Sequence, residues 1–269
     1  MIRQWYDIGV NLFSEQFAKD RPAVIQRARA QGVSQLLLIS SDLAETRLNI
    51  SWCAEHQGCV TTAGVHPHQA ARVQPGWQEE LRRLLQHSSS VAVGECGLDF
   101  NRNFSPRPQQ ISVFTEQLQL SRLFAKPVYL HERDAFGTQL AILKEHQISL
   151  GVVHCFTGDT TQLKAYLDLG LYIGITGWVC DERRGQALQQ AIPYIPDDRL
   201  LLETDAPYLL PRNISPKPAD RRNEPALLPA IAGTVATLRQ TSLEQLSAIT
   251  FANSQRLFRH PTQPADPHA

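Results

Sequence analysis

Short runs of apolar and β-branched residues recur eight times along the chain, and each is followed by a polar turn and a segment with helical spacing of apolar residues. This alternation allows few folds, because parallel strands must be joined by crossover connections, usually helices. The runs are WYDIGV (5–10), LLLIS (36–40), VTTAGV (60–65), VAVGE (91–95), PVYLH (127–131), GVVHC (151–155), LYIGI (171–175) and LLLET (200–204).

A closed barrel of parallel strands accommodates this pattern best. The 269 residues divide into eight units of about 34 residues, which is the size that the units of a TIM (β/α)8 barrel require. An open, doubly wound sheet is the alternative, but it usually has fewer strands, and no Gly-x-Gly-x-x-Gly or Walker loop marks its first turn. We therefore predict an α/β TIM barrel with its active site at the C-terminal ends of the strands.

Two of the helices can be placed by their end signals. Residues 14–32 have Ser14 to cap a helix and Gly32 to end it. Residues 105–125 begin with Ser105 and Pro106, the order expected of an N-cap followed by a first-turn proline.

The chain reads as one domain. No internal repeat or low-complexity linker divides it, so residues 1–260 are expected to form a single barrel. Residues 261–269 (PTQPADPHA) are rich in proline and poor in apolar residues, which predicts a disordered tail.

Composition limits the cellular setting and the partners. Lys plus Arg and Asp plus Glu both number 26, so an anionic partner would have to be held by local patches. Five cysteines without a C-x-x-C pair argue against a disulfide framework and favour a reducing compartment. No signal peptide and no apolar run of membrane-spanning length is present. We expect a soluble cytoplasmic protein that does not bind membranes. The helices show no clear apolar patch for a dimer, so we also expect a monomer.

Reactive side chains end five of the eight runs. Because the active site of such a barrel lies at the carboxyl ends of its strands, these side chains should meet at one mouth. Alternation agrees, since Val91 and Val93 share a face with Glu95, and Tyr129 and Val152 each precede a histidine by two positions. The five residues are His66, Glu95, His131, His154 and Asp205.

A divalent cation most simply explains two imidazoles and two carboxylates that converge on one mouth. The candidate ligands are Glu95, His131, His154 and Asp205. Taken alone, each histidine could instead be a buried structural residue. Magnesium prefers carboxylates and water, whereas zinc, manganese and iron suit imidazoles better, so these residues leave the metal open. Because such an ion lowers the pKa of bound water, the chemistry indicated is hydrolysis.

Cys96 and Cys155 each follow a candidate ligand directly. Alternation turns them to the opposite face, toward the helices. We expect both to be buried small hydrophobic residues rather than catalytic thiols.

Three loops beyond the strand ends carry local positive charge: 98–104, 180–185 and 211–225. A solvated surface explains each loop equally well, but together with a hydrolytic mouth they favour a phosphodiester substrate. Trp178 and Tyr208 could stack an unpaired base or simply pack, and His68 could share the mouth or be exposed. The candidate substrate-binding residues are Asn11, His68, Arg102, Trp178, Arg212 and Arg222.

Several longer segments together carry a family resemblance. Over nearly its full length the chain resembles the TatD family of metal-dependent deoxyribonucleases, which are amidohydrolase-like barrels. The segments are AGVHPH (63–68), VGECGLDFNRNFSP (93–106), LHERDA (130–135), HCFTG (154–158), YIGITGWVCDERRG (172–185), ETDAPYLLPR (203–212) and KPADRRNEP (217–225).

The resemblance implies a magnesium-dependent exonuclease that trims single-stranded DNA or RNA from the 3′ end. It implies metal ligation by Glu95, His131 and His154, with Asp205 at the metal and at the nucleophilic water. Glu203 and His66 are implied as further active-site residues, so that the catalytic candidates are Asp205, Glu203 and His66.

The first strand departs from the family pattern. Many members have His-x-His at its end, whereas this chain has Gly9 and Asn11. Glycine cannot ligate a metal and asparagine offers only a neutral oxygen, so one ion is favoured over two, and magnesium over zinc, with manganese or zinc as alternatives.

Two other functions remain open at this point. The same metal site could hydrolyse the ester of an aminoacyl-tRNA or a small amide or lactone, because fold alone does not choose a substrate. A chain without the first-strand histidines could also be a catalytically weak protein that binds single-stranded nucleic acid.

Overall fold

All eight predicted strands form, and they pair in parallel in the order of the chain, from β1 to β8. The computed structural model describes residues 3–258, so the predicted tail, 261–269, lies outside the described residues. The strands are β1 (Trp5–Val10), β2 (Val33–Leu38), β3 (Cys59–Ala63), β4 (Ser90–Asp99), β5 (Val128–Arg133), β6 (Gly151–Val153), β7 (Tyr172–Ile175) and β8 (Leu200–Leu202).

Backbone contacts just beyond β8 bring the two edges of the sheet together. The N–H of Asp205 donates to the carbonyl of Gly9 at 2.9 Å, and the N–H of Asn11 donates to the carbonyl of Ala206 at 2.8 Å. These bonds run between the first strand and the segment that follows the last, so the sheet nearly closes into a barrel. The TIM barrel is therefore confirmed, and the closure sets Asn11 next to Asp205.

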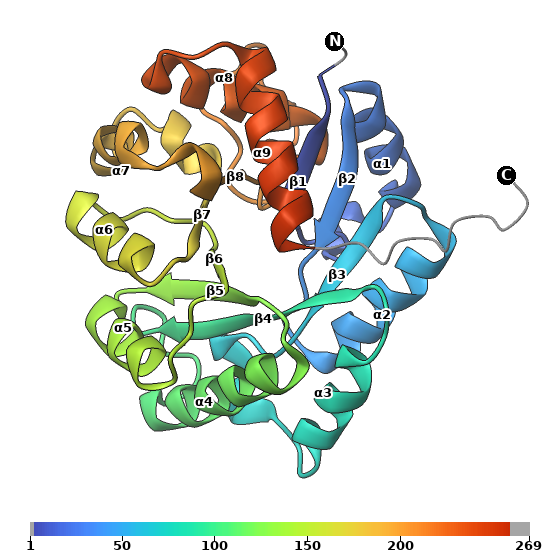
Figure 1. Ribbon diagram of the computed structural model, residues 1–269. Helices are drawn as coiled ribbons and strands as arrows, with labels where there is room; N and C mark the ends of the chain where they lie inside the picture. Colours follow the sequence, from blue (N-terminus) through green and yellow to red (C-terminus); the bar gives the residue numbers. More distant parts are fainter. Residues whose placement is uncertain (1–2, 259–269) are drawn as a thin grey trace, which may run out of the picture.

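Helices surround the barrel on the outside, as Figure 1 shows. Apolar side chains of the strands pack against them in a continuous outer core. Among the described residues, none of the helices combines the length and apolar character needed to cross a membrane. The helices are α1 (Arg21–Ala30), α2 (Leu43–Glu55), α3 (Trp77–Leu85), α4 (Arg107–Phe124), α5 (Phe136–Glu145), α6 (Thr160–Asp168), α7 (Gln186–Ala191), α8 (Leu228–Arg239) and α9 (Leu243–Leu257).

Both predicted helix starts are wrong in detail. Ser14 caps only a short 3-10 turn, Glu15–Phe17, and α1 begins later, at Arg21. Ser105 does not cap α4, because its hydroxyl donates to the carbonyl of His68 and accepts the N–H of Ala71. Ser105 thus ties the loop after β3 to the loop after β4, a long-range use that local signals do not reveal.

The C-terminal helix α9 closes the amino-terminal end of the barrel. Its Phe251 and the following Phe258 lie against Tyr6 of β1, with ring centroids 6.3 Å away in both cases. The amide of Asn253 donates to the carbonyl of Leu200 at 3.0 Å, at the start of β8. With this end covered by α9 (Figure 1), the open mouth lies at the carboxyl ends of the strands.

The predicted alternation along β4 is wrong at one position. Val91 packs in the inner core of the barrel, but Val93 packs outside it, in the core under α3. The pairing of β4 with β5 is irregular between Val93 and Cys96, and this irregularity changes which residues face inward. Glu95 nevertheless reaches the mouth.

Candidate active site

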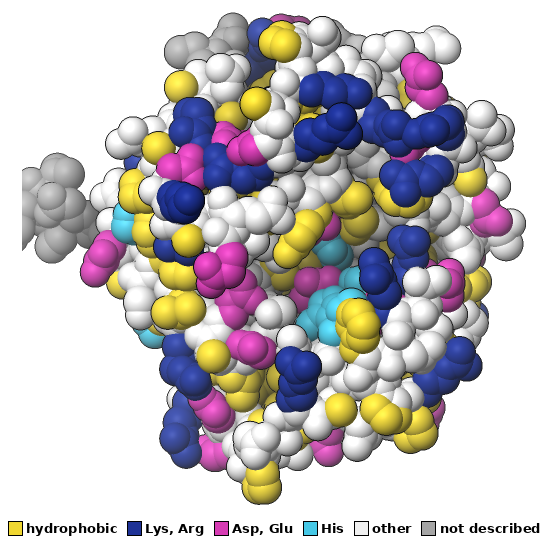
Figure 2. All heavy atoms as spheres, turned by 180° about the vertical axis from the view of Figure 1, so that it is seen from behind, with side chains coloured by type: hydrophobic (Ala, Val, Ile, Leu, Met, Phe, Trp, Pro, Cys, Tyr) yellow, Lys and Arg dark blue, Asp and Glu magenta, His cyan; other side chains and the backbone are white. Residues whose placement is uncertain are grey.

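A pocket of about 390 Å³ opens at the carboxyl ends of the strands, where the sequence predicts the site. Figure 2 looks into this face and shows histidine side chains on the floor of a hollow whose rim carries Lys and Arg side chains. The residues that line the pocket are Asn11, Ser41, His66, His68, Gln69, Glu95, His131, Glu132, Arg133, His154, Cys155, Thr157, Trp178, Asp205, Tyr208 and Leu209.

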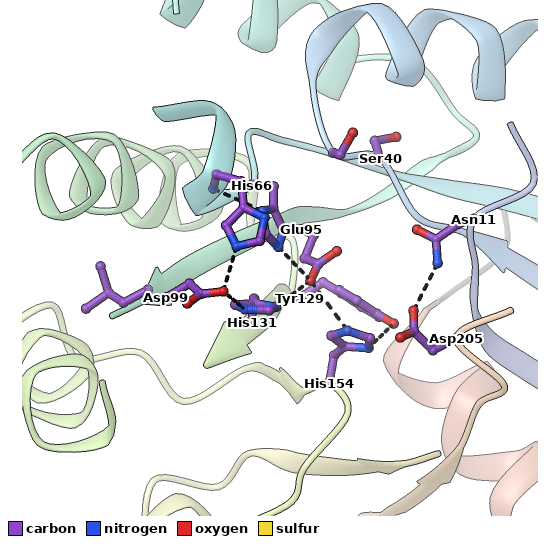
Figure 3. Close-up of polar contacts among 12 residues, drawn as sticks. Asn11, Ser40, His66, Glu95, Asp99, Tyr129, His131, His154 and Asp205 are labelled. Atoms are coloured by element: carbon purple, nitrogen blue, oxygen red, sulfur yellow. Dashed lines mark hydrogen bonds and ion pairs between the residues drawn. The ribbon is translucent and has the colours of Figure 1, made fainter. Parts of the chain in front are cut away.

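Glu95 lies at the centre of three histidines (Figure 3). Its Oε1 atom lies 2.9 Å from Nδ1 of His131. The Nε2 atoms of His66 and His154 are each 3.4 Å from the same oxygen. Burial alone would raise the pKa of Glu95, but the three imidazoles hold it well below its ordinary value. The Glu95 carboxylate is therefore charged, and the three imidazoles share it.

His154 is oriented from below by a fully buried carboxylate, that of Glu203. Its Nδ1 lies 2.8 Å from Oε2 of Glu203, and the hydroxyl of Tyr129 donates to that oxygen at 2.7 Å. Because Oε2 of Glu203 accepts from Nδ1 of His154, that nitrogen carries a proton, and in the neutral ring Nε2, which faces Glu95, offers a lone pair. Glu203 and Glu95 raise the pKa of His154 against the opposing effect of its burial.

Glu203 does not line the pocket, and its carboxylate is occupied on both oxygens. Its Oε1 accepts the backbone N–H of Cys155 at 2.5 Å, while Oε2 faces Tyr129 and His154. The side chain is fully buried. This placement does not favour the direct catalytic role predicted for Glu203 and instead suits a residue that positions His154.

His66 has the opposite tautomer. Its Nδ1 accepts the backbone N–H of His68 at 3.0 Å, so in the neutral ring Nε2 carries the proton, toward Glu95. Burial lowers the pKa of His66 to about 4, which keeps the ring neutral. His66 is thus suited to donate a hydrogen bond in the mouth, in keeping with its predicted place as an active-site residue rather than a metal ligand.

Asp99 is a buried carboxylate of the site that the sequence analysis missed. Its Oδ2 lies 2.6 Å from Nε2 of His68 and 3.4 Å from Nε2 of His131. His68 consequently lines the mouth, which was one of its two predicted positions. The available signal was alternation, because Asp99 is four residues beyond Glu95 on β4 and shares its face.

Asn11 and Asp205 face each other across the seam of the barrel (Figure 3). The Asn11 amide donates to Oδ1 of Asp205 at 2.9 Å, and Oδ2 makes no hydrogen bond to the described residues. Burial, with smaller effects from Glu95 and Glu203, raises the pKa of Asp205 to about 7.

The structure explains why glycine occupies position 9. A Cβ atom there would lie 2.5 Å from Oε2 of Glu203 and 2.8 Å from the hydroxyl of Tyr129. No side chain fits without displacing the pair that holds His154. In this chain, Glu203 and Tyr129 fill the space that a first-strand histidine would require.

The donor set of the pocket fits a divalent cation. Two groups each bring three potential ligand atoms within 4.8 Å of one another: His66, Glu95 and His131, and His154, Cys155 and Asp205. Nε2 of His131 is buried and makes no hydrogen bond of good geometry to the described residues, although Oδ2 of Asp99 lies 3.4 Å away. An imidazole nitrogen left bare next to carboxylates is the expected state of a metal ligand.

Cys155 is not where alternation puts it. Its side chain lines the pocket instead of facing the helices, and its Sγ lies 3.6 Å from the Thr176 hydroxyl. The residue has a φ of 47°, so the chain has left the extended conformation on which alternation depends. Burial raises the pKa of the thiol to about 12. The expectation for Cys96 is confirmed, because it is fully buried in the outer core.

Of three residues predicted at the rim, Trp178 lines the pocket, whereas Arg102 and Arg212 do not. Arg212 lies 3.3 Å from Asp181 in the loop after β7. Arg102 is exposed and does not line the pocket, although its backbone N–H donates to Asp99 at 2.7 Å.

Arg222 is bound in an ion-pair network away from the pocket. Its guanidinium lies 2.8 Å from Asp20 and 2.6 Å from Glu224, and it is only 14% exposed. This placement does not favour its predicted role in substrate binding, because both terminal nitrogens are already held by carboxylates and the carbonyl of Gln16. Arg133, which the sequence analysis did not single out, lines the pocket instead.

Comparison with known proteins agrees with the geometry. Residues 6–259 match the model of the family described as TatD related DNase. The "3'-5' ssDNA/RNA exonuclease TatD" of Klebsiella pneumoniae (strain 342) is 51% identical over 255 residues, which cover 94% of this chain and 97% of that protein.

Solved structures show the same likeness. The crystal structure of the TatD homolog YJJV from Escherichia coli K12 has a TM-score of 0.88 and 27% identity, covering 97% of this chain and all of that one. An uncharacterized amidohydrolase from Saccharomyces cerevisiae has a TM-score of 0.85 at 22% identity, covering 96% of this chain and all of that one, a likeness of fold alone. On its sequence and its fold, the chain belongs to the family of TatD-related DNases.

Proposed function

We propose that this chain is a metal-dependent 3′–5′ exonuclease that hydrolyses phosphodiester bonds of single-stranded DNA and RNA. The observation that carries the proposal is the group of three histidines around the Glu95 carboxylate, next to Asp205, at the open end of the barrel. A relative 51% identical over nearly the whole length bears the name of such an exonuclease.

The ion that we propose is a single Mg²⁺, with Mn²⁺ and Zn²⁺ as alternatives. Glu95, His131, His154 and Asp205 would hold it, because they supply imidazole nitrogens and carboxylate oxygens to the pocket, among them the unbonded Nε2 of His131. When bound, a divalent cation makes water nucleophilic near neutral pH and neutralises charge that grows on a phosphoryl oxygen.

The chain's own residues supply position and proton transfer. Asn11 holds Oδ1 of Asp205 and leaves Oδ2 to accept a proton from the attacking water. Glu203 and Tyr129 fix the ring of His154. His66, whose N–H points into the mouth, donates to a phosphoryl oxygen and stabilises its charge without reading the base.

The five cysteines are unpaired, which supports a cytoplasmic location. We propose a monomer, the state that the sequence predicts from the lack of a clear apolar dimer patch on its helices.

The decisive experiment uses 5′-labelled single-stranded DNA and metal-stripped protein. Mg²⁺, Mn²⁺ or Zn²⁺ is added back, and a copy of the strand with a 3′ phosphate is tested in parallel. We expect a ladder that shortens from the free 3′ end and is blocked by the phosphate. Glu95→Ala should abolish this turnover while its circular dichroism spectrum and melting stay native-like. Full turnover in Glu95→Ala would refute the proposed ligand set.

The same assay separates the other functions. Strand binding without products under any ion would identify a binding protein, and release of amino acid from aminoacyl-tRNA by the same preparation would identify an esterase.

A further inference from the structure

Two hollows adjoin the candidate active site on different sides of the barrel mouth. One of 660 Å³ borders the loops after β1 and β2 and shares Asn11, Ser41 and Tyr208 with the pocket. The other, of 470 Å³, borders the loops after β5, β6 and β7. It shares four residues with the pocket: Glu132, Arg133, Thr157 and Trp178. A strand whose end lies in the pocket can leave along either of them.

The charges of the two hollows differ. The first is lined by three carboxylates, Glu15, Asp42 and Glu45, and by no Lys or Arg among the described residues. The second is lined by Arg133 and Arg184 together with two acidic residues. A phosphate chain is repelled by the first and can pair with cations in the second.

The two acidic residues of the second hollow are engaged by neighbours. Oε1 of Glu132 accepts the backbone N–H of Ala135 at 2.7 Å. Oδ2 of Asp134 accepts the amide of Asn101 at 2.6 Å. Neither carboxylate lies within ion-pair distance of an arginine of the hollow, so neither occupies the guanidinium donors.

Trp178 organises these guanidinium groups. The Arg184 guanidinium lies over its indole ring, 4.4 Å from the centroid, and that of Arg133 lies 5.7 Å from it. Arg133 is exposed, and its guanidinium makes no hydrogen bond or ion pair within residues 3–258. Arg184 is held through Nε by the buried Asp181 at 2.8 Å, which leaves both of its terminal nitrogens available. The Arg184 guanidinium, which is fixed in this way, loses little entropy when it binds a phosphate.

We propose that this hollow is a subsite for the phosphate backbone of the nucleotides on the 5′ side of the scissile bond. Arg133 and Arg184 pair with successive phosphates, and Trp178 and Asp181 position them. The inference rests on the proposed function, which puts the 3′-terminal nucleotide in the pocket. Since guanidinium–phosphate pairs carry no base information, the subsite gives affinity for longer strands without sequence preference.

Steady-state kinetics with two substrates tests the subsite. A dinucleotide reaches the pocket alone, whereas a strand several times longer also crosses the hollow. For the longer strand, Arg133→Ala and Arg184→Ala should each raise KM roughly tenfold, the scale of a lost charged hydrogen bond, with kcat unchanged. The dinucleotide should show no change with Arg184→Ala, because Arg184 lines the hollow and not the pocket, whereas Arg133 lines both. Arg183→Ala is the matched control, because that arginine is in the same exposed loop but lines neither hollow.

A binding measurement makes the test independent of catalysis. In a Glu95→Ala background, the slope of log affinity against log salt for the longer strand should fall by about 0.7 for each arginine removed. An unchanged slope and KM would overturn the subsite, and so would an equal KM increase for dinucleotide and long strand in Arg184→Ala. If the wild type cleaves neither substrate, the proposed function fails instead, and the binding arm still decides whether the hollow holds phosphates.

Discussion

The Oε2 atom of Glu203 lies 2.8 Å from Nδ1 of His154, and both side chains are buried at the base of the candidate pocket. The hydroxyl of Tyr129 and the backbone N–H of Cys155 hold the same carboxylate. Because the carboxylate cannot turn, the imidazole is locked with Nε2 toward Glu95. A carboxylate–histidine pair of this kind sets the tautomer and the basicity of a metal-binding imidazole.

Glu203→Gln is expected to weaken metal binding before it affects anything else. The amide cannot accept from Tyr129 and His154 and also from Cys155 on equal terms, so the ring of His154 loses its orientation. We expect a loss of 10- to 100-fold in metal affinity, roughly the usual effect of such a partner. The metal dependence of activity measures it, and excess metal should restore much of the rate. Glu79→Gln, on the exposed face of α3, is the control. An unaltered metal titration would rule out this positioning role.

Gly9→Ala should destabilise the barrel and lower activity together. The added methyl would lie 2.5 Å from Oε2 of Glu203, so the buried pair must shift. We expect a loss of about 1–3 kcal/mol in the free energy of unfolding, as for overpacking of a tight core. Gly233→Ala in α8 is the matched control, because nothing lies within 4 Å of the new methyl. It should stabilise the helix by roughly 0.5–1 kcal/mol. Urea unfolding of both variants gives the comparison, and equal effects would contradict it.

Asp7 should make stability depend on pH around neutrality. Burial raises the pKa of this carboxyl to about 8, with a small contribution from Glu203, against hydrogen bonds from Thr204 and Gly9. Between about pH 4 and pH 8 the folded chain therefore holds a proton at Asp7 that the unfolded chain has released. Stability from this group falls as pH rises through that window.

Asp7→Asn removes the ionisable carboxyl group and with it this dependence of stability on pH. The difference in unfolding free energy between Asp7→Asn and the wild type should shift in favour of the variant from pH 5 to pH 8. Urea midpoints at several pH values measure it, with the exposed Asp168→Asn as the charge control. A constant difference across this range would show that Asp7 is ionised in the folded protein.

Arg222→Ala should affect stability rather than nucleic-acid binding. The guanidinium joins Asp20 to Glu224 and lies 5.0 Å from the ring centroid of Phe17, so it fastens the segment after β8 to the entrance of α1. We expect a loss of about 1–2 kcal/mol in unfolding free energy, since the network is partly exposed. The salt dependence of strand binding should be that of the wild type. A flatter salt dependence with unchanged stability would return Arg222 to the substrate-binding residues.

Local pattern was sufficient for the barrel and for most of the mouth. The runs that became β1 to β8 are recognisable because strand periodicity and crossover length are local properties of a chain. His66, Glu95, His131, His154 and Asp205 could be grouped because the carboxyl ends of parallel strands meet at one edge. Neither inference depends on which side-chain atoms contact one another.

The pairing of side chains was decided only by the tertiary structure. Cys155 and Asp205 have φ values of 47° and 55°, so beyond the strand ends the side-chain directions no longer follow alternation. Whether an arginine such as Arg222 meets substrate or a carboxylate depends on residues some 200 positions away, such as Asp20. The sequence by itself determined the fold and the edge at which the chemistry lies. Contacts across the closed barrel decided which groups point into the mouth and which, like Glu203, support it from below, because such contacts depend on register and closure rather than on local pattern.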